Sequence, residues 1–278
     1  MRAWIGAVLW CAACGGKGAG TGPTDAHDPG DGHPNGDGAS GLHLPPVNAS
    51  FDYQLGGAYA PPTGVQIVSR DRTASPATGL YNICYVNGFQ IQPDEASDWT
   101  TNHPDLILRD GQGAPVIDTD WNEMLIDVGT PAKRTAVAAI VGGWIDGCRS
   151  KGFDAIEIDN LDSYARSGGL LTPDTNVAAM ALFSAHAHAA GLAIAQKNSS
   201  ELVARSAELG TDFAVAEECN HYDECQSYRD GYGDHVLVIE YVRADFTKGC
   251  GAFPGLSIVL RDRNLVAPPQ AAYVFDGC

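Results

Sequence analysis

The sequence predicts a single (β/α)8 barrel in its C-terminal part. Three observations support this prediction: short apolar segments recur eight times, helical patterns separate several of them, and most of the segments end in a charged or amide residue. Apolar strands that alternate with helices are typical of a parallel sheet covered on both faces. Eight such units close into a barrel whose functional residues lie at the carboxyl ends of the strands.

The predicted strands are short and mostly apolar. They cover residues 65–68, 81–86, 124–126, 155–158, 192–195, 213–215, 236–239 and 256–260. A parallel strand pair needs a crossover connection that usually contains a helix. The link at residues 72–79 is too short for a full crossover helix, and the link at residues 242–255 is marginal. We therefore expect the barrel to be irregular at its first and seventh crossovers.

Three helices are predicted from apolar spacing and from their end signals. The first covers residues 131–149, where Thr130 is a suitable N-cap and Pro131 occupies the first helical position. The other two cover about residues 173–190 and 200–209, and a glycine follows each of them. These helices provide the crossovers that parallel strands require.

The N-terminal residues are not predicted to belong to the barrel domain, which we place at residues 50–278. Residues 1–14 begin with a positive charge, continue with a short apolar stretch and end in small residues before Cys14, which is the pattern of an export signal. The small residues before Cys14 resemble the lipobox of bacterial lipoproteins, which implies lipidation of the Cys14 thiol. An ordinary signal peptide or a misassigned start codon is the alternative.

Residues 15–49 are rich in Gly, Asp and Pro. Such a segment buries too little apolar surface to offset its chain entropy, so we expect a flexible tether. The sequence therefore predicts an exported protein, either a lipoprotein of the outer surface or an extracellular protein.

Six cysteines lie within the predicted domain. An even number behind an export signal favours disulfides. The expected pairs are Cys219 with Cys225, which are close in sequence, Cys84 with Cys148, and Cys250 with Cys278. Zinc binding is the alternative, although one Cys-x5-Cys pair without a second close pair is unlike the spacing of zinc fingers.

The chain is strongly acidic, with 34 Asp and Glu against 17 Lys and Arg and a formal net charge of −17. A protein that binds nucleic acid through its phosphates needs a basic surface, so we expect no nucleic-acid partner. We expect contact with a membrane only through the lipid anchor, because no polybasic face is present and no apolar run approaches the roughly 20 residues of a membrane span. We further expect a monomer without a metal or a cofactor.

Carboxylates concentrate at the ends of the fourth and sixth predicted strands. Glu157 and Asp159 are two residues apart, so both side chains face the barrel interior. Glu217 and Glu218 end the sixth strand, and only one of them can face inward. Carboxylates from separate strands at a barrel mouth suit glycoside cleavage, which needs one carboxylate and one carboxylic acid beside the bond. Helix capping, ion pairing and a divalent-metal site are the alternative interpretations.

Three ordered motifs carry a family resemblance. They are Gly-Phe-Asp-Ala-Ile-Glu-Ile-Asp-Asn-Leu-Asp at 152–162, Gln-Lys-Asn at 196–198, and Asp-Phe-Ala-Val-Ala-Glu-Glu-Cys at 212–219 followed by Tyr-Asp-Glu-Cys at 222–225. Over about residues 51–278 the sequence resembles glycoside hydrolase family 114, the endo-α-1,4-polygalactosaminidases and their relatives. The resemblance implies a (β/α)8 barrel and places the catalytic carboxylates at Asp159 and Glu217. One departure is Ala-Glu-Glu-Cys at 216–219, where the family usually has Asn-Glu-Gln-Cys.

Roles for these residues follow from the resemblance and from the strand order. We expect Asp159 to be the nucleophile, kept ionised by Lys197, and Glu217 to be the general acid and base. This assignment predicts a retaining mechanism. The expected substrate contacts all lie near strand ends: Asp127, Asn160, Asp162, Lys197, Asn198, Glu240, Tyr241 and Asp262. Trp99 and Trp121 are candidates either for stacking on sugar rings or for the core.

The predicted function is therefore a secreted or lipid-anchored hydrolase that cleaves internal α-1,4-galactosaminidic bonds. Its partner would be a cationic, amino-sugar polysaccharide, which an acidic barrel mouth attracts. The alternative function is a surface lipoprotein that binds polysaccharide without cleaving it.

Overall fold

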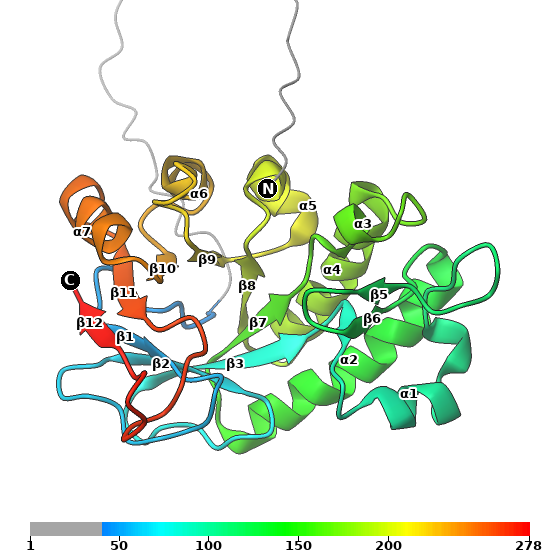
Figure 1. The fold of residues 1–278 in the computed structure, drawn as a ribbon, viewed down its shortest axis with the longest axis horizontal. Helices are drawn as coiled ribbons and strands as arrows, with labels where there is room; N and C mark the ends of the chain where they lie inside the picture. Colours follow the sequence, from blue (N-terminus) through cyan, green and yellow to red (C-terminus); the bar gives the residue numbers. More distant parts are fainter. Residues whose placement is uncertain (1–40) are drawn as a thin grey trace, which may run out of the picture. The chain divides into compact units, whose positions relative to one another are not determined.

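The structure, a computed structural model, describes residues 41–278 of the chain (Figure 1). The predicted export signal, Cys14 and most of the predicted tether lie outside the described residues. Residues 43–49 contact the barrel: the Ala49 amide donates a hydrogen bond to Ser257 Oγ (2.9 Å), and the Tyr81 hydroxyl donates to the His43 carbonyl (2.7 Å). The folded part therefore begins before residue 50, where the sequence placed the domain boundary.

Eight parallel strands form a nearly closed barrel. In order around the sheet they are β1 (Phe51–Tyr53), β2 (Ile67–Asp71), β3 (Tyr81–Asn87), β7 (Ala155–Asp159), β8 (Ala193–Lys197), β9 (Phe213–Glu217), β10 (Val236–Glu240) and β11 (Ser257–Arg261). A short antiparallel strand, β12 (Phe275–Gly277), extends the sheet beyond β11. Arg261 links β11 to β1, because its guanidinium donates to Asp52 Oδ1 (2.7 Å) and to the Tyr53 carbonyl.

Two of the predicted strand positions differ from the structure. β1 is absent from the prediction, because a three-residue strand is too short to show a pattern. The segment at 124–126 was predicted as a barrel strand and instead forms β6 (Glu123–Leu125), which pairs with β4 (Gln90–Ile91) and β5 (Ile117–Asp118) in a separate antiparallel sheet. The predicted number of barrel strands is right because these two errors cancel.

Helices cover the outside of the barrel. The longest are α2 (Pro131–Lys151) and α4 (Pro173–Ala189). Thr130 caps α2 as predicted, since its side chain accepts a hydrogen bond from the Lys133 amide, and Thr172 and Thr175 form a capping box on α4. The remaining helices are α1 (Ala96–Asn102), η1 (Pro104–Leu106), α3 (Ser163–Arg166), η2 (Ser200–Arg205), α5 (Ser206–Leu209), α6 (Cys225–Tyr232) and α7 (Arg243–Ala252).

The crossovers differ in their helical content. The link between β2 and β3 holds no helix, as its length predicts, whereas the link between β10 and β11 holds the ten-residue helix α7. The third predicted helix is divided into η2 and α5. No described helix is both long enough and apolar enough to cross a bilayer.

Alternation along the strands separates the barrel lumen from the outer layers. The lumen is filled by alternate strand residues, among them Phe51, Ile67, Ile83, Ala155, Ala195, Phe213, Val215 and Ile239. Their sequence neighbours, such as Val86 and Ile158, pack outward against α2 and α4. Because the alternation continues to the strand ends, the last inward position of each strand faces the barrel mouth.

Three disulfides connect strands, helices and the C-terminus. They are Cys84–Cys148, Cys219–Cys225 and Cys250–Cys278. All three expected pairs are confirmed. The first links β3 to α2, the second links the end of β9 to α6, and the third links α7 to the last residue of the chain.

Candidate active site

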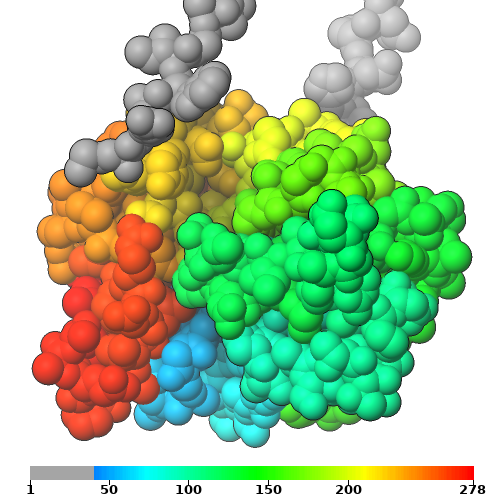
Figure 2. Space-filling model, turned by 45° about the vertical axis from the view of Figure 1, so that its right-hand side comes forward, coloured from blue at the N-terminus to red at the C-terminus, as the bar shows by residue number. Residues whose placement is uncertain are grey.

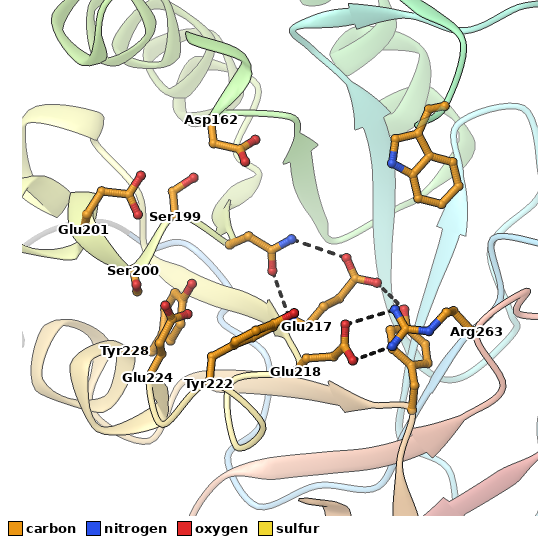
Figure 3. Close-up of a pocket in the computed structure, with 13 residues that line it drawn as sticks. Asp162, Ser199, Ser200, Glu201, Glu217, Glu218, Tyr222, Glu224, Tyr228 and Arg263 are labelled. Carbon is orange, nitrogen blue, oxygen red and sulfur yellow. Dashed lines mark hydrogen bonds and ion pairs between the residues drawn. The ribbon is translucent and has the colours of Figure 1, made fainter. Parts of the chain in front are cut away.

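A main cleft of about 600 Å³ opens at the carboxyl ends of the barrel strands, lined by Tyr53, Tyr85, Asp159, Lys197, Glu217 and their neighbours. In Figure 2 the opening is a hollow between the orange-red segment that follows β11 and the green segment that holds β5 and β6. A side cleft of about 440 Å³ adjoins it, lined by Ser199, Glu201, Tyr222, Glu224, Tyr228 and others (Figure 3). The two clefts share Trp121, Asp162, Asn198, Glu217, Tyr241 and Arg263.

Lys197 joins the two expected catalytic carboxylates in the main cleft. Its Nζ lies 3.4 Å from Asp159 Oδ1 and 3.1 Å from Glu217 Oε2. These distances place the nearest oxygens of Asp159 and Glu217 within about 6.5 Å of each other. The Lys197 side chain is only 2% exposed, so protein oxygens and not water surround the ammonium group.

The Asp159 carboxylate is held in its ionised form. The Tyr85 hydroxyl donates to Oδ2 (2.6 Å), and Lys197 donates to Oδ1. Burial opposes the charge, but the Lys197 ammonium and the Tyr85 hydrogen bond outweigh it and lower the pKa of Asp159. Although burial acts against the Lys197 charge, the neighbouring carboxylates raise the pKa of Lys197, so the cation persists. Asp159 is therefore equipped to act as a nucleophile.

Both oxygens of Glu217 are held by polar partners. The Tyr241 hydroxyl donates to Oε1, and Asn198 Nδ2 donates to Oε2 at 3.3 Å (Figure 3). Asn198 also accepts a hydrogen bond from the Glu217 backbone amide (2.8 Å), which fixes the two strand ends relative to each other. The Glu217 side chain is 27% exposed and lines both clefts. Its carboxyl group can therefore meet a substrate from either side.

Buried side chains of Glu157, Tyr53 and Ser69 hold the ammonium group of Lys197 on the side of the barrel lumen. Glu157 Oε1 lies 3.3 Å from Lys197 Nζ and accepts a hydrogen bond from the Tyr53 hydroxyl (2.5 Å), while Ser69 donates to Oε2 (2.8 Å). Burial raises the pKa of Glu157 and that of Tyr53. Because Glu157 has no exposure, it positions Lys197 and does not contact a substrate.

The structure brings most of the predicted site residues together. Asn160, Asp162, Lys197, Asn198 and Tyr241 line the main cleft with Asp159 and Glu217, as the sequence predicts. The two candidate tryptophans differ: Trp121 is 69% exposed and lines both clefts, whereas Trp99 is 2% exposed and belongs to the core.

Three predicted substrate contacts are corrected by the structure, because their side chains do not reach either cleft. Asp127 follows β6, which is outside the barrel, and accepts hydrogen bonds from Lys133 and a loop amide near the start of α2. Glu240 occupies an outward position of β10 and accepts two hydrogen bonds from Asn220 (2.9 and 3.0 Å). Asp262 accepts hydrogen bonds from two backbone amides of the loop that follows β11.

Several residues of the site were missed from the sequence. Tyr53 lies on the unpredicted strand β1. Tyr85 was detectable, since it follows the inward Ile83 by two residues. Arg263, in the loop after β11, binds the Glu218 carboxylate through both terminal nitrogens (2.6 and 3.1 Å) and lies 4.9 Å from the centre of the Tyr241 ring. Nothing local in the sequence specifies that long-range pair.

Two clusters of side chains contain residue types that could bind a metal ion. The ammonium group of Lys197 occupies the position between the Asp159 and Glu217 carboxylates that a divalent cation would need. In residues 41–278, ligand atoms of Cys219, Cys225 and Glu240 lie within 4.8 Å of one another, but the two sulfurs are bonded to each other as a disulfide. The site therefore favours chemistry by side chains.

Comparison with known proteins identifies relatives of the chain. The model of glycoside-hydrolase family GH114 matches residues 34–278. Ega3 of Aspergillus fumigatus, solved in complex with galactosamine, has a TM-score of 0.70 and 20% identity, and the match covers 87% of this chain and 100% of that chain. The glycoside hydrolase domain of PelA from Pseudomonas aeruginosa has a TM-score of 0.54 and 13% identity, covering 81% and 97%. At these identities the two structures show the fold. The comparison with curated proteins gives no match.

Proposed function

The chain belongs to glycoside-hydrolase family GH114, and from this premise we propose that it cleaves internal α-1,4 bonds of a galactosamine-containing polysaccharide with retention of configuration. The observation that carries the proposal is the pairing of Asp159 and Glu217 around one lysine at the barrel mouth. A separation of about 5–5.5 Å between carboxyl groups is typical of retaining enzymes, and the limit set by Lys197 is compatible with it. Galactosamine in the complex of the similar Ega3 supports the substrate class.

In the first step, Asp159 attacks the anomeric carbon while the bond from that carbon to the glycosidic oxygen breaks. Glu217 donates its proton to the departing oxygen, so the leaving sugar departs with a neutral hydroxyl group. Lys197 supports this step, because it keeps Asp159 ionised before the attack. The product is a glycosyl ester of Asp159.

In the second step, water replaces Asp159 at the anomeric carbon. Glu217, now a carboxylate, accepts a proton from the water as its oxygen attacks, and the ester bond to Asp159 breaks. Tyr241 and Asn198 hold Glu217 in place for both proton transfers. Each step inverts the anomeric carbon, so the two together retain its configuration.

The direct test is the release of new reducing ends from an α-1,4-linked galactosamine polymer. We expect Asp159→Asn and Glu217→Gln each to lower kcat by at least about a thousandfold, because each removes a group that acts on the reacting atoms. Asp105→Asn, which removes one charge from an exposed residue of η1, is the matched control and should keep full activity. A wild-type protein that binds the polymer without releasing reducing ends would contradict the proposal.

Two further measurements test the finer parts of the proposal. Proton NMR of the first product should show the α-anomer, and early release of the β-anomer would show inversion instead. The size distribution of early products should contain oligosaccharides, as expected for cleavage of internal bonds, whereas monosaccharide alone would indicate cleavage from chain ends.

We also propose that the protein is exported and lipidated at Cys14. The three disulfides support export, because disulfides persist in oxidising compartments. Radiolabelled fatty acid should be incorporated into the full chain expressed in a bacterial host and should be absent from Cys14→Ser. Labelling that persists in this variant would contradict lipidation at this residue.

A further inference from the structure

The side cleft is rich in carboxylates, and two of them lack a cationic partner among residues 41–278. Carboxylates line it from two sides in Figure 3, from Asp162, Glu201, Glu217, Glu218 and Glu224. Glu224, at the start of α6, makes no hydrogen bond or ion pair through its side chain with any residue of the described range 41–278. Glu201, on η2, accepts a hydrogen bond from the neutral Tyr164 hydroxyl. Two negative charges are therefore available to a ligand in this cleft.

The basic side chains nearby are already engaged. Arg263 lines the side cleft, and its guanidinium is bound to Glu218 by two hydrogen bonds. Arg166 binds Asp162 in the same way, at 2.8 Å from each terminal nitrogen. Asp162 and Glu218 are therefore neutralised, whereas Glu201 on η2 and Glu224 at the start of α6 keep their charges without a cationic partner in the described residues.

Two largely buried residues also present hydroxyl groups to the side cleft, and neither hydroxyl has a partner in the described part of the chain. Tyr228 is 2% exposed, its ring packs in the core beneath α6, and its hydroxyl group makes no hydrogen bond there. Ser199 is 8% exposed, and its Oγ likewise has no partner. In Figure 3 the Ser199 hydroxyl points into the space between Asp162 and Glu201. A buried hydroxyl is normally hydrogen-bonded, so the unpartnered Ser199 Oγ indicates a polar ligand, and the unpartnered Tyr228 hydroxyl is a second group that could bind it.

The side cleft differs from the main cleft in which of the two candidate catalytic carboxylates lines it. Asp159 lines only the main cleft, so the sugar whose anomeric carbon is attacked lies there. Glu217, which protonates the leaving oxygen, lines both clefts. Glu217 therefore connects the two clefts, and the side cleft is the space beyond it on the side away from Asp159.

We propose that the side cleft binds the protonated free amine of the sugar on the leaving-group side of the cleaved bond. Glu224 and Glu201 supply the counter-charges, and the Tyr228 and Ser199 hydroxyls accept further hydrogen bonds. An ammonium group donates three hydrogen bonds, whereas an acetamido group is neutral, donates one and adds a methyl group. The acetylated sugar would leave carboxylates without a partner, which a polar site disfavours strongly. This inference rests on the proposed hydrolase function.

The test uses the full chain and an α-1,4-linked galactosamine polymer in which half of the amines are acetylated. Each cleavage creates a new non-reducing end, which comes from the leaving-group side, and a new reducing end, which comes from the other side. Random cleavage would give equal numbers of free and acetylated amines at the new non-reducing ends, whereas mass spectrometry should show about ten free amines for each acetylated one. Glu224→Gln and Glu201→Gln should reduce this enrichment and leave the composition of the new reducing ends unchanged.

Glu208→Gln is the matched control, because it removes the same charge from an exposed residue of α5 outside both clefts. It should leave the enrichment unchanged. New non-reducing ends that match the average composition of the polymer, or an enrichment that survives in both cleft variants, would overturn the inference while the hydrolase function stands.

A binding measurement separates failure of this inference from failure of the proposed function. Calorimetry with a galactosamine trisaccharide and its fully acetylated form does not depend on turnover. The free-amine form should bind the wild type more tightly, and Glu224→Gln should weaken that binding about tenfold. If no polymer is cleaved, a preference for the free-amine form that Glu224→Gln removes still supports the cleft as an amine site. Equal binding of the two trisaccharides refutes it.

Discussion

Replacing Lys197 by methionine tests the electrostatic basis of the site most directly. Methionine keeps an unbranched side chain of similar length and removes the charge together with the N–H donors of the ammonium group. At 3.4 Å from Asp159 Oδ1, a unit charge contributes about 5 kcal/mol at an effective dielectric constant of about 20. The Tyr85 hydrogen bond persists in the variant and the site relaxes, so we expect about a third of this energy to be lost. That loss corresponds to more than a tenfold fall in kcat/KM on the acidic limb of the pH profile.

The direction of the change follows from the pKa of Asp159. Lys197 lowers that pKa, so the ionised nucleophile is present above the lowered value and is lost as the pH falls through it. Without the lysine the pKa of Asp159 rises, and the acidic limb of kcat/KM moves to higher pH.

The assay is kcat/KM for a galactosamine oligosaccharide measured from acid to neutral pH, with thermal melting to confirm that the variant is folded. Tyr85→Phe is the control, since it removes a neutral donor from the same carboxylate and should move the acidic limb in the same direction by less. A folded Lys197→Met protein whose acidic limb stays in place, or moves to lower pH, would refute the assignment of Lys197 as the group that keeps Asp159 ionised.

Three further changes have defined outcomes. Tyr241→Phe removes a donor that orients Glu217, so steady-state kinetics should show kcat about tenfold lower with KM little changed. Trp121→Ala removes an exposed ring shared by both clefts, so KM should rise up to about tenfold with kcat preserved. Replacing Cys84 and Cys148 together by serine opens a link between residues 64 apart in sequence, so chemical denaturation should show a loss of about 4 kcal/mol, and a loss below about 1 kcal/mol would contradict the chain-entropy argument.

The barrel could be predicted because the same sequence pattern, an apolar run followed by a helix, recurs along the chain. Seven of the eight barrel strands carry an apolar run long enough to recognise, and the two long helices carry threonine caps that mark where they begin. The eighth strand could not be predicted, because β1 has only three residues and is defined by its pairing with β2. The segment at 124–126 has the same local pattern as a barrel strand, and only its hydrogen-bond partners place it in the other sheet.

The sequence could predict those site residues whose direction depends only on the alternation of side chains along one strand. Asp159, Lys197 and Glu217 each end a strand at an inward position, and the sequence assigned all three to the site. The same alternation separates Glu240 from Tyr241, although the sequence prediction placed both in the site. Ile239 faces the lumen, so Tyr241 faces the mouth and Glu240 faces outward. The rest of the site depends on contacts between distant segments.

Glu217 and Glu218 are adjacent in sequence and have different roles because of the backbone between them. Glu217 is the last inward residue of β9, and Glu218 has a φ of 57°, in the left-handed region that non-glycine residues rarely adopt. Asn160 and Asn198 have φ values of 63° and 50° directly after Asp159 and Lys197, so a residue in the left-handed region follows each of the three strands that supply the candidate catalytic residues.

Asparagine tolerates this conformation, and glutamate does so at a cost of about 1 kcal/mol or more. The turn directs the Glu218 carboxylate away from Lys197 and toward Arg263, where two hydrogen bonds hold it at the rim (Figure 3). The left-handed turn therefore places one of two consecutive glutamates beside Lys197 and the other in the wall of the side cleft.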